Sequence, residues 1–531
     1  MTFSLRHRDW PWLLAATLLA TAALHLPELR LGFNHISGEL GDTRLVGYLL
    51  EHSWQRILGH GHWRSPQFFW PIGGTLGYAD AFVLHGLAYW PLRALGCNPL
   101  AALHGQMLVH DALTYLCTAL LLRHGLKISL PWALLGAWWF AVSAVKVHQT
   151  EHLQLQPLEL LPLIAWLVLR GAQAQSPKRA LLAYGGAALL FDLQLLSGFY
   201  VGWYLALWSG LALLGALLHR QLRPALGALV KRQLGPLVAA SVLLVLGALP
   251  FLYIYLPVVA DTGVRPWSIV SRGVPPALAL LHVDPMNWIW GWTAKLAIFH
   301  GFSWENNLGF GLLLPLGGLL TLVALVRRRS GSEVQRLAIY AVLLPTFALL
   351  VLGVQWGPWE PWYLVYRVVP GGGAIRAVGR WVLVALLPLT CAILLQVQAW
   401  ISEKGDKQRR WKIGFFALGL FAAAEQVGDR LQFDRVAEMA RLDALAQQVS
   451  PQCQAIYVTT KTDLPNYLLH LDGMWASMIS GVPTVNGYSG NEPLIWFGLS
   501  DIHAPDYRHQ VDLWLNYHKI HGACELDVRG L

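Results

Sequence analysis

Long apolar segments alternate with polar connections along the chain up to residue 425. About eleven of these segments are long enough, or nearly so, to cross the hydrocarbon core of a bilayer, which is about 30 Å thick. They cover residues 12–26, 100–122, 131–147, 153–169, 180–196, 199–218, 237–258, 308–326, 337–354, 381–400 and 413–424. The pattern predicts an all-α polytopic membrane protein with about eleven transmembrane helices.

The composition and the charge pattern support this interpretation. Of 531 residues, 55% are hydrophobic and 13% are charged, a balance that a water-soluble core of this size would not need. The net charge of +9 comes from basic residues on alternate connections, such as 123–127 and 220–232, which indicates that these connections and the N-terminus are cytoplasmic. Because the basic residues are spread over several connections, no nucleic-acid partner is expected.

After residue 425 the apolar segments stop, and an odd number of spans puts the rest of the chain outside. We therefore expect a transmembrane domain over 1–425, with a long first outer loop at 27–99, and a small extracytoplasmic α/β module over 426–531. Within this tail, residue spacing predicts strands and helices. The strands are expected at 455–459 and 483–485, and the helices at 464–480 and 503–518.

Two cysteines of the tail, Cys453 and Cys524, face an oxidising compartment in this topology, where they either form a disulfide or remain free. The sequence has no Asn-x-Ser/Thr sequon, which favours a bacterial over a eukaryotic secretory origin. The predicted location is thus the inner membrane of a bacterial cell.

Asp42 follows the first apolar segment and is the first candidate for chemistry. A carboxylate beside hydrocarbon costs several kcal/mol unless it is solvated or paired, so it is a candidate base at the outer edge of the helices. The alternative is a loop residue that caps the helix starting near Thr43.

The rest of the first outer loop contains two expected surface helices, at 43–58 and 79–95. Asp80 ends the aromatic and turn-rich segment between them, and His85 follows one helical turn later. These side chains suit binding to sugar hydroxyl groups.

A second polar group lies in the connection at 148–156, which contains His148, Glu151 and His152. The two histidines are spaced four residues apart, so they either bind a divalent metal together with Asp42 or Glu151, or line a polar site. No other cofactor is indicated.

Arg376 and Arg380 flank the tenth span on its outer side, where arginine is unusual. A phosphate held by arginine would explain them, and so would lipid headgroups or an ion pair with Glu360. In the tail, Asn486 and Tyr488 lie in a segment rich in Gly, Ser and Tyr, which either contacts a sugar or is a turn that docks the tail on the bundle.

Taken with the topology, these features resemble the GT-C superfamily of membrane glycosyltransferases, whose donors are sugars on polyprenyl phosphate. The matching features are the acid directly after the first span, the long first outer loop, the polar connection at 148–156 and the arginines near 376–380. The chain lacks the Trp-Trp-Asp signature of the oligosaccharyltransferase branch, so protein N-glycosylation is not expected.

The resemblance implies an inverting transfer of a hexose or pentose from a polyprenyl-phosphate carrier to a glycan or lipid acceptor at the outer membrane face. Asp42 would be the general base, and Arg376 and Arg380 would stabilise the leaving phosphate. Two other functions stay open. Polar residues inside the spans, His110, Asp111 and Glu159, suit a transporter or flippase of lipid-linked glycans, and the tail suits a non-catalytic assembly protein.

Overall fold

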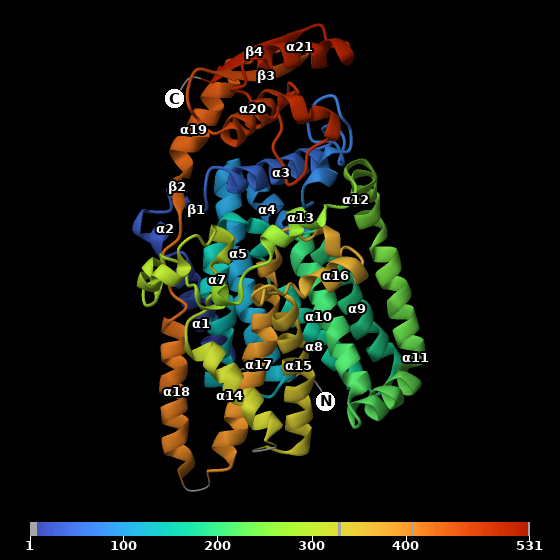
Figure 1. Cartoon of the computed structure of the whole chain (residues 1–531), viewed down its shortest axis with the longest axis vertical. Helices are drawn as coiled ribbons and strands as arrows, with labels where there is room; N and C mark the ends of the chain where they lie inside the picture. Colours follow the sequence, from blue (N-terminus) through green and yellow to red (C-terminus); the bar gives the residue numbers. More distant parts are fainter. Residues whose placement is uncertain (1–7, 328–330, 405–406, 529–531) are drawn as a thin grey trace.

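The computed structural model describes residues 8–327, 331–404 and 407–528, and it consists of a helical bundle with a smaller module above one end (Figure 1). Among these residues, seven helical stretches are long and apolar enough to cross a membrane. They contain α5 (Pro99–Leu120), α6 (Leu130–Ala141), α8 (Leu160–Ala172), α10 (Phe199–Leu218), α11 (Leu222–Gly247), α15 (Glu333–Leu352) and α17 (Trp381–Ser402). The chain is therefore a multi-pass membrane protein.

Further helices of the bundle are shorter or less apolar. They are α1 (Trp10–Leu24), α9 (Pro177–Leu195), α12 (Leu249–Thr262), α14 (Leu313–Val326) and α18 (Gln408–Ala424). Each of the eleven predicted segments overlaps one or two helices, but the predicted count of about eleven spans stays a prediction, because length and composition single out seven.

Helix α17 forms the centre of the bundle. It is apolar on every side and buried along nearly its whole length, with α6, α10, α14 and α15 packed around it. Helix α11, by contrast, exposes half of its leucine and valine side chains and buries none of them, as expected of a helix that faces lipid.

The first outer loop contains α2 (Leu26–Arg30), α3 (Asp42–Ile57) and α4 (Val83–Ala94). The predicted helices at 43–58 and 79–95 are thus present as α3 and α4. However, α3 does not lie exposed on the membrane surface, as we expected. It crosses the end of the bundle beneath the tail (Figure 1), and its residues 43–53 are buried because the tail, α4 and α5 all pack against this helix.

The tail is a small α/β module, as predicted. Its strands β3 (Ala455–Thr460) and β4 (Ala523–Val528) pair in parallel, with Ala455 opposite Ala523. A parallel pair needs a long crossover, which α20 (Asn466–Ser480) and α21 (Tyr507–Tyr517) provide. The predicted strand at 483–485 contributes a single bridge, between Thr484 and Ile456. Cys453 and Cys524 form a disulfide beside the start of both strands.

The tail is joined to the first outer loop at several places. Strand β1 (His35–Ser37) pairs antiparallel with β2 (Gln432–Asp434), which leads into α19 (Arg435–Ala446). The backbone N–H of Trp70 donates to the carbonyl of Thr484 at 2.9 Å. These contacts support the docking interpretation of the tail segment, while the domain boundary near residue 426 remains a prediction.

Candidate active site

Asp42 is the first residue of α3, but its carboxylate does not cap that helix. Instead, the carboxylate of Glu39 accepts the backbone N–H groups of Gly41, at 2.6 Å, and of Asp42. The capping alternative for Asp42 is therefore wrong. Because Glu39 satisfies the helix terminus, the Asp42 side chain is available for other contacts.

Two side chains from distant parts of the chain contact this carboxylate. The hydroxyl of Tyr488 donates a hydrogen bond to Oδ1 at 2.9 Å, and Nε2 of His152 lies 3.5 Å from Oδ2. The Asp42 side chain is 26% exposed, so solvent or a substrate can reach it. Burial raises the pKa of Asp42, although the Tyr488 hydrogen bond and the charges of Arg380 and Arg376 act to lower it.

His152 lies between two helical stretches of membrane length, Leu130–Glu151, which contains α7 (Ala144–His148), and Leu153–Ala172. Burial, together with the positive charge of Arg380, holds the pKa of His152 well below its usual value. The ring is therefore neutral near pH 7. It packs beside Trp304, with ring centroids 5.4 Å apart.

Arg380 and Glu305 form an ion pair next to His152. Nη2 of Arg380 lies 2.7 Å from Oε1 of Glu305, and the same oxygen is 4.0 Å from Nε2 of His152. The guanidinium of Arg380 also stacks on Tyr200 at 5.1 Å. Arg380 is buried and engaged, whereas Arg376 is exposed and has no side-chain hydrogen bond or ion pair within the described ranges.

Glu305 and Tyr200, the two partners of Arg380, were not predicted from the sequence. Glu305 belongs to the long connection between α12 and α14, in the turn Trp304–Asn306. Its only sequence signal is that it is an acid in a connection with few charged residues, which is too general to single it out.

His148 does not form a metal pair with His152. Its Nδ1 bonds the carboxylate of Asp284 and its Nε2 donates to the carbonyl of Trp304 at 3.0 Å, so both ring nitrogens are engaged. Its ring packs against that of Trp304, with ring centroids 3.9 Å apart. Although burial opposes it, the hydrogen bond from His148 lowers the pKa of Asp284. His148 therefore positions Trp304, the neighbour of Glu305.

Glu151 is half-buried within electrostatic range of Asp42 and Glu39, and no hydrogen bond of its side chain is found in the described part of the chain. Among the described residues, the one group of three side chains close enough to share a metal ion is elsewhere, at His25, Glu28 and His104. The alternative of a metal held by His148 and His152 with Asp42 or Glu151 is thus not supported.

Three other predicted sugar ligands serve the fold in the structure. Asp80 accepts the backbone N–H of Phe199, at the start of α10, and burial raises the pKa of Asp80 to about 6. Nε2 of His85 is 2.9 Å from the carbonyl of Leu153, next to His152. Asn486 is buried, and its side chain bonds Val458, His470 and Tyr507. Each of these three side chains thus uses at least one polar atom in a contact inside the protein.

No protein-family model and no curated protein sequence matches the chain. Solved structures that are similar to it include the oligosaccharyltransferase of Archaeoglobus fulgidus in complex with Zn and sulfate, at 13% identity and a TM-score of 0.45. The similarity covers 90% of this chain and 62% of that one. ArnT from Cupriavidus metallidurans in the apo state is similar at 14% identity and a TM-score of 0.31, over 90% of this chain and 86% of that one.

Both neighbours are membrane glycosyltransferases of the GT-C superfamily, the same superfamily that the sequence resembles. This chain spans less than two thirds of the length of the Archaeoglobus protein, 62%. Because both TM-scores are below 0.5, the similarity carries no inference about activity.

Proposed function

We propose that the chain is a GT-C-type membrane glycosyltransferase. It transfers a hexose or pentose from a polyprenyl-phosphate carrier to a hydroxyl group of a glycan or lipid, with inversion at the anomeric carbon. The observation that carries the proposal is the partly exposed carboxylate of Asp42, which Tyr488 orients and which Arg376 and Arg380 neighbour. Such a reaction needs a base close to positive charge, because the acceptor loses a proton while a phosphate gains negative charge.

In the proposed step, Asp42 accepts the proton of the acceptor hydroxyl group. The acceptor oxygen forms a bond to the anomeric carbon as the bond from that carbon to the phosphate oxygen breaks, and the carrier leaves as polyprenyl phosphate. Burial raises the pKa of Asp42, which makes its ionised form a stronger base. General base catalysis of this kind contributes about 10²- to 10⁴-fold in rate.

The two arginines have different roles in this proposal. Arg376 is exposed and free of side-chain partners in the described residues, so it can bind the carrier phosphate directly. Arg380 is held by Glu305 and Tyr200 and acts on Asp42 and on the phosphate through its charge. In the described residues neither arginine pairs with Glu360, so that alternative is not supported, whereas headgroup anchoring remains an outcome of the test of Arg376.

The polar groups inside the spans favour an enzyme over a transporter. His110 bonds Glu159 at 2.6 Å, and Asp111 pairs with Lys146. All four side chains are buried, at 3% exposure or less. Paired and buried groups do not line an open path for a lipid-linked glycan.

The test uses the full chain in detergent or liposomes with polyprenyl-phosphate hexoses and pentoses as donors. Asp42→Asn should abolish sugar transfer while the protein remains folded and still binds the carrier. The matched control is Asp261→Asn, since Asp261 also accepts a tyrosine hydrogen bond, from Tyr78 at 2.7 Å. Transfer at the wild-type rate by Asp42→Asn would exclude Asp42 as the base. A wild-type protein that transfers no sugar but moves lipid between leaflets would be a transporter.

A further inference from the structure

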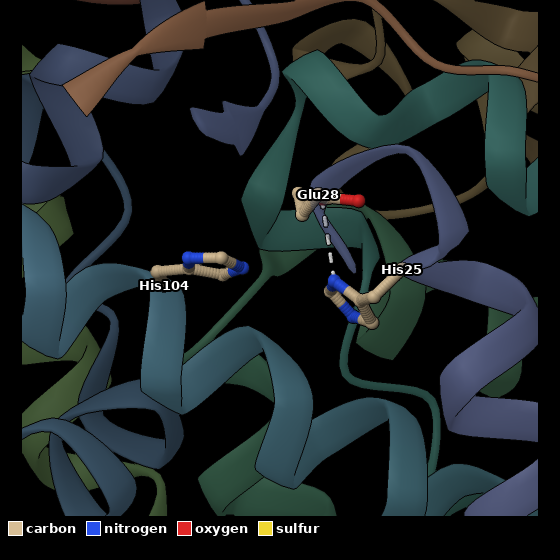
Figure 2. A group of neighbouring side chains, drawn as sticks. All are labelled: His25, Glu28 and His104. Atoms are coloured by element: carbon tan, nitrogen blue, oxygen red, sulfur yellow. Dashed lines mark hydrogen bonds and ion pairs between the residues drawn. The ribbon is translucent and has the colours of Figure 1, made fainter. Parts of the chain in front are cut away.

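A cluster of three potential metal ligands lies away from Asp42 (Figure 2). His25 follows α1, Glu28 belongs to α2, and His104 is in the first half of α5. One ligand atom from each residue lies within 4.8 Å of the other two. All three side chains are buried, with exposures of 1%, 0% and 3%.

Two atoms of this cluster have no hydrogen-bond partner among the residues that the structure describes. They are Nε2 of His104 and Oε2 of Glu28. Leaving a buried polar atom unpaired costs about 1–3 kcal/mol, so native proteins satisfy most such atoms. In Figure 2 the ring of His104 points toward His25 and Glu28. An imidazole nitrogen and a carboxylate oxygen are ligand atoms that a divalent metal would satisfy.

The environment of His25 prepares its ring for a metal. Nε2 of His25 is 2.9 Å from a carboxylate oxygen of Asp111, so Nε2 carries the proton in the neutral ring. Nδ1 then presents a lone pair toward Oε1 of Glu28, 3.3 Å away. Two acceptor atoms at this distance repel each other unless a proton or a cation joins them. A carboxylate on the far nitrogen is also the usual support of a metal-binding histidine.

We propose that His25, Glu28 and His104 bind a divalent transition-metal ion, with zinc as the expected occupant. Two imidazoles and one carboxylate form a donor set that suits zinc better than magnesium or calcium. The ion would join α1 and α2 to α5. It would also support the tail, because Ser37 donates to Glu28 and lies in β1, which pairs with β2.

The charges around the cluster define the competing arrangement. Lys146 pairs with Asp111, and Nη1 of Arg430 is 3.8 Å from the same carboxylate, so two cations oppose a further positive charge. Without a metal, a proton on Nδ1 of His25 would join that ring to Glu28 instead. The two arrangements differ at His104, because only a metal uses its Nε2.

The experiment measures bound metal in the full chain, purified in detergent without a polyhistidine tag and incubated with zinc before dialysis. We expect about one zinc ion per chain by mass spectrometry of the metal content. His104→Phe should abolish zinc binding while it keeps the ring contact with Phe33, whose centroid is 5.5 Å away. His104→Cys, which provides another zinc ligand, should restore binding.

His282→Phe is the control. His282 is also buried, has an unpartnered Nδ1 and packs on Phe299, but it belongs to no group of metal ligands among the described residues. Zinc in the control but not in His104→Phe, with a lower Tm for His104→Phe, supports the site.

Absence of zinc from the wild-type chain overturns the proposal, and so does equal zinc in His104→Phe. An unchanged or higher Tm for His104→Phe points to the protonated His25 instead, because phenylalanine removes an unsatisfied nitrogen from the core. If His104→Phe does not fold, X-ray absorption spectroscopy of zinc bound to the wild-type chain tests the site. The proposal requires two imidazole nitrogens and carboxylate oxygen as zinc ligands, and any other ligand set overturns it. None of these readings requires glycosyltransferase activity, so they are independent of the proposed function.

Discussion

The hydroxyl of Tyr488 donates a hydrogen bond to the carboxylate of Asp42 across a sequence separation of 446 residues. Tyr488 belongs to the tail and Asp42 to the first outer loop, so the tail completes the surroundings of the proposed base. The contact depends on the docking of the tail segment onto the first outer loop, where Ser489 donates to the carbonyl of Tyr78 at 2.8 Å.

Tyr488→Phe should move the acid side of the pH–rate profile to higher pH. The Tyr488 hydrogen bond lowers the pKa of Asp42 against the effect of burial, so its loss raises that pKa further. Asp42 must be ionised to accept a proton, and transfer is therefore lost at a higher pH as the solution is acidified. A hydrogen bond to a charged group is worth about 1.5–3 kcal/mol, which corresponds to a shift of about one to two pH units.

The measurement is kcat/KM against pH for the wild type and the variant. Tyr467→Phe is the matched control, because the ring of Tyr467 lies 5.8 Å from that of Tyr488 while the hydrogen bond to Asp42 comes from Tyr488. Identical profiles for Tyr488→Phe and the wild type would show that Asp42 is not the group whose ionisation limits the rate.

Arg376→Ala should weaken binding of the lipid phosphate by about tenfold or more, with little effect on acceptor binding, because a charge-assisted hydrogen bond contributes about 1.5–3 kcal/mol. Separate titrations with polyprenyl phosphate and with acceptor measure the two affinities. Arg376→Lys keeps the charge and should recover part of the loss. Equal losses for both ligands would indicate a structural role or headgroup anchoring.

Arg380→Ala should reduce the rate more than Arg376→Ala does. It removes a positive charge that lowers the pKa of Asp42 and leaves Glu305, whose charge raises that pKa, without its partner. The acid side of the pH–rate profile should therefore move to higher pH as well. The double variant Arg380→Ala, Glu305→Gln tests whether the unpaired charge of Glu305 contributes. Because it removes both charges, it should reverse part of the shift of the pH–rate profile. An unchanged profile in the single variant would contradict this prediction.

Local sequence patterns predicted the helices well, because apolar runs of membrane length become helices whatever surrounds them. They also indicated polar groups on three outward segments, and Asp42, His152 and Arg380 do lie close together. What the pattern could not indicate is which atoms remain available. Asp80 and Asn486 are as polar in sequence as Asp42, but partners from remote segments occupy them.

The same limit explains the errors in the tail and in the first outer loop. Helix α3 has the spacing of a surface helix, yet a second layer covers it, and only tertiary structure reveals that layer. Strand β4 pairs in parallel with a strand more than sixty residues earlier, so no local turn signal announces it. Glu305 is significant only because the arginine it pairs with belongs to a different outer loop.

Arg44 is the centre of the buried network that holds the tail on α3. Its Nη1 lies 2.8 Å from Glu438 in α19 and 2.6 Å from Asp472 in α20, and its side chain is 1% exposed. Arg441 contacts the same two carboxylates from the more exposed side. Arg44 is two residues after Asp42 in the same helix, so this network also fixes the position of the proposed base.

Arg44→Ala should lower the free energy of unfolding by about 3 kcal/mol, because removing one partner leaves two buried carboxylates with less compensation. Arg508→Ala is the control. Arg508 also pairs with a glutamate, Glu525 at 2.5 Å, but it is 71% exposed, so its loss should cost less than about 1 kcal/mol. Thermal unfolding of both variants in the same detergent measures the difference. Equal stabilities of Arg44→Ala and Arg508→Ala would mean that Arg441 alone balances Glu438 and Asp472. If Arg44→Ala loses more sugar transfer than folded protein, docking of the tail positions Asp42.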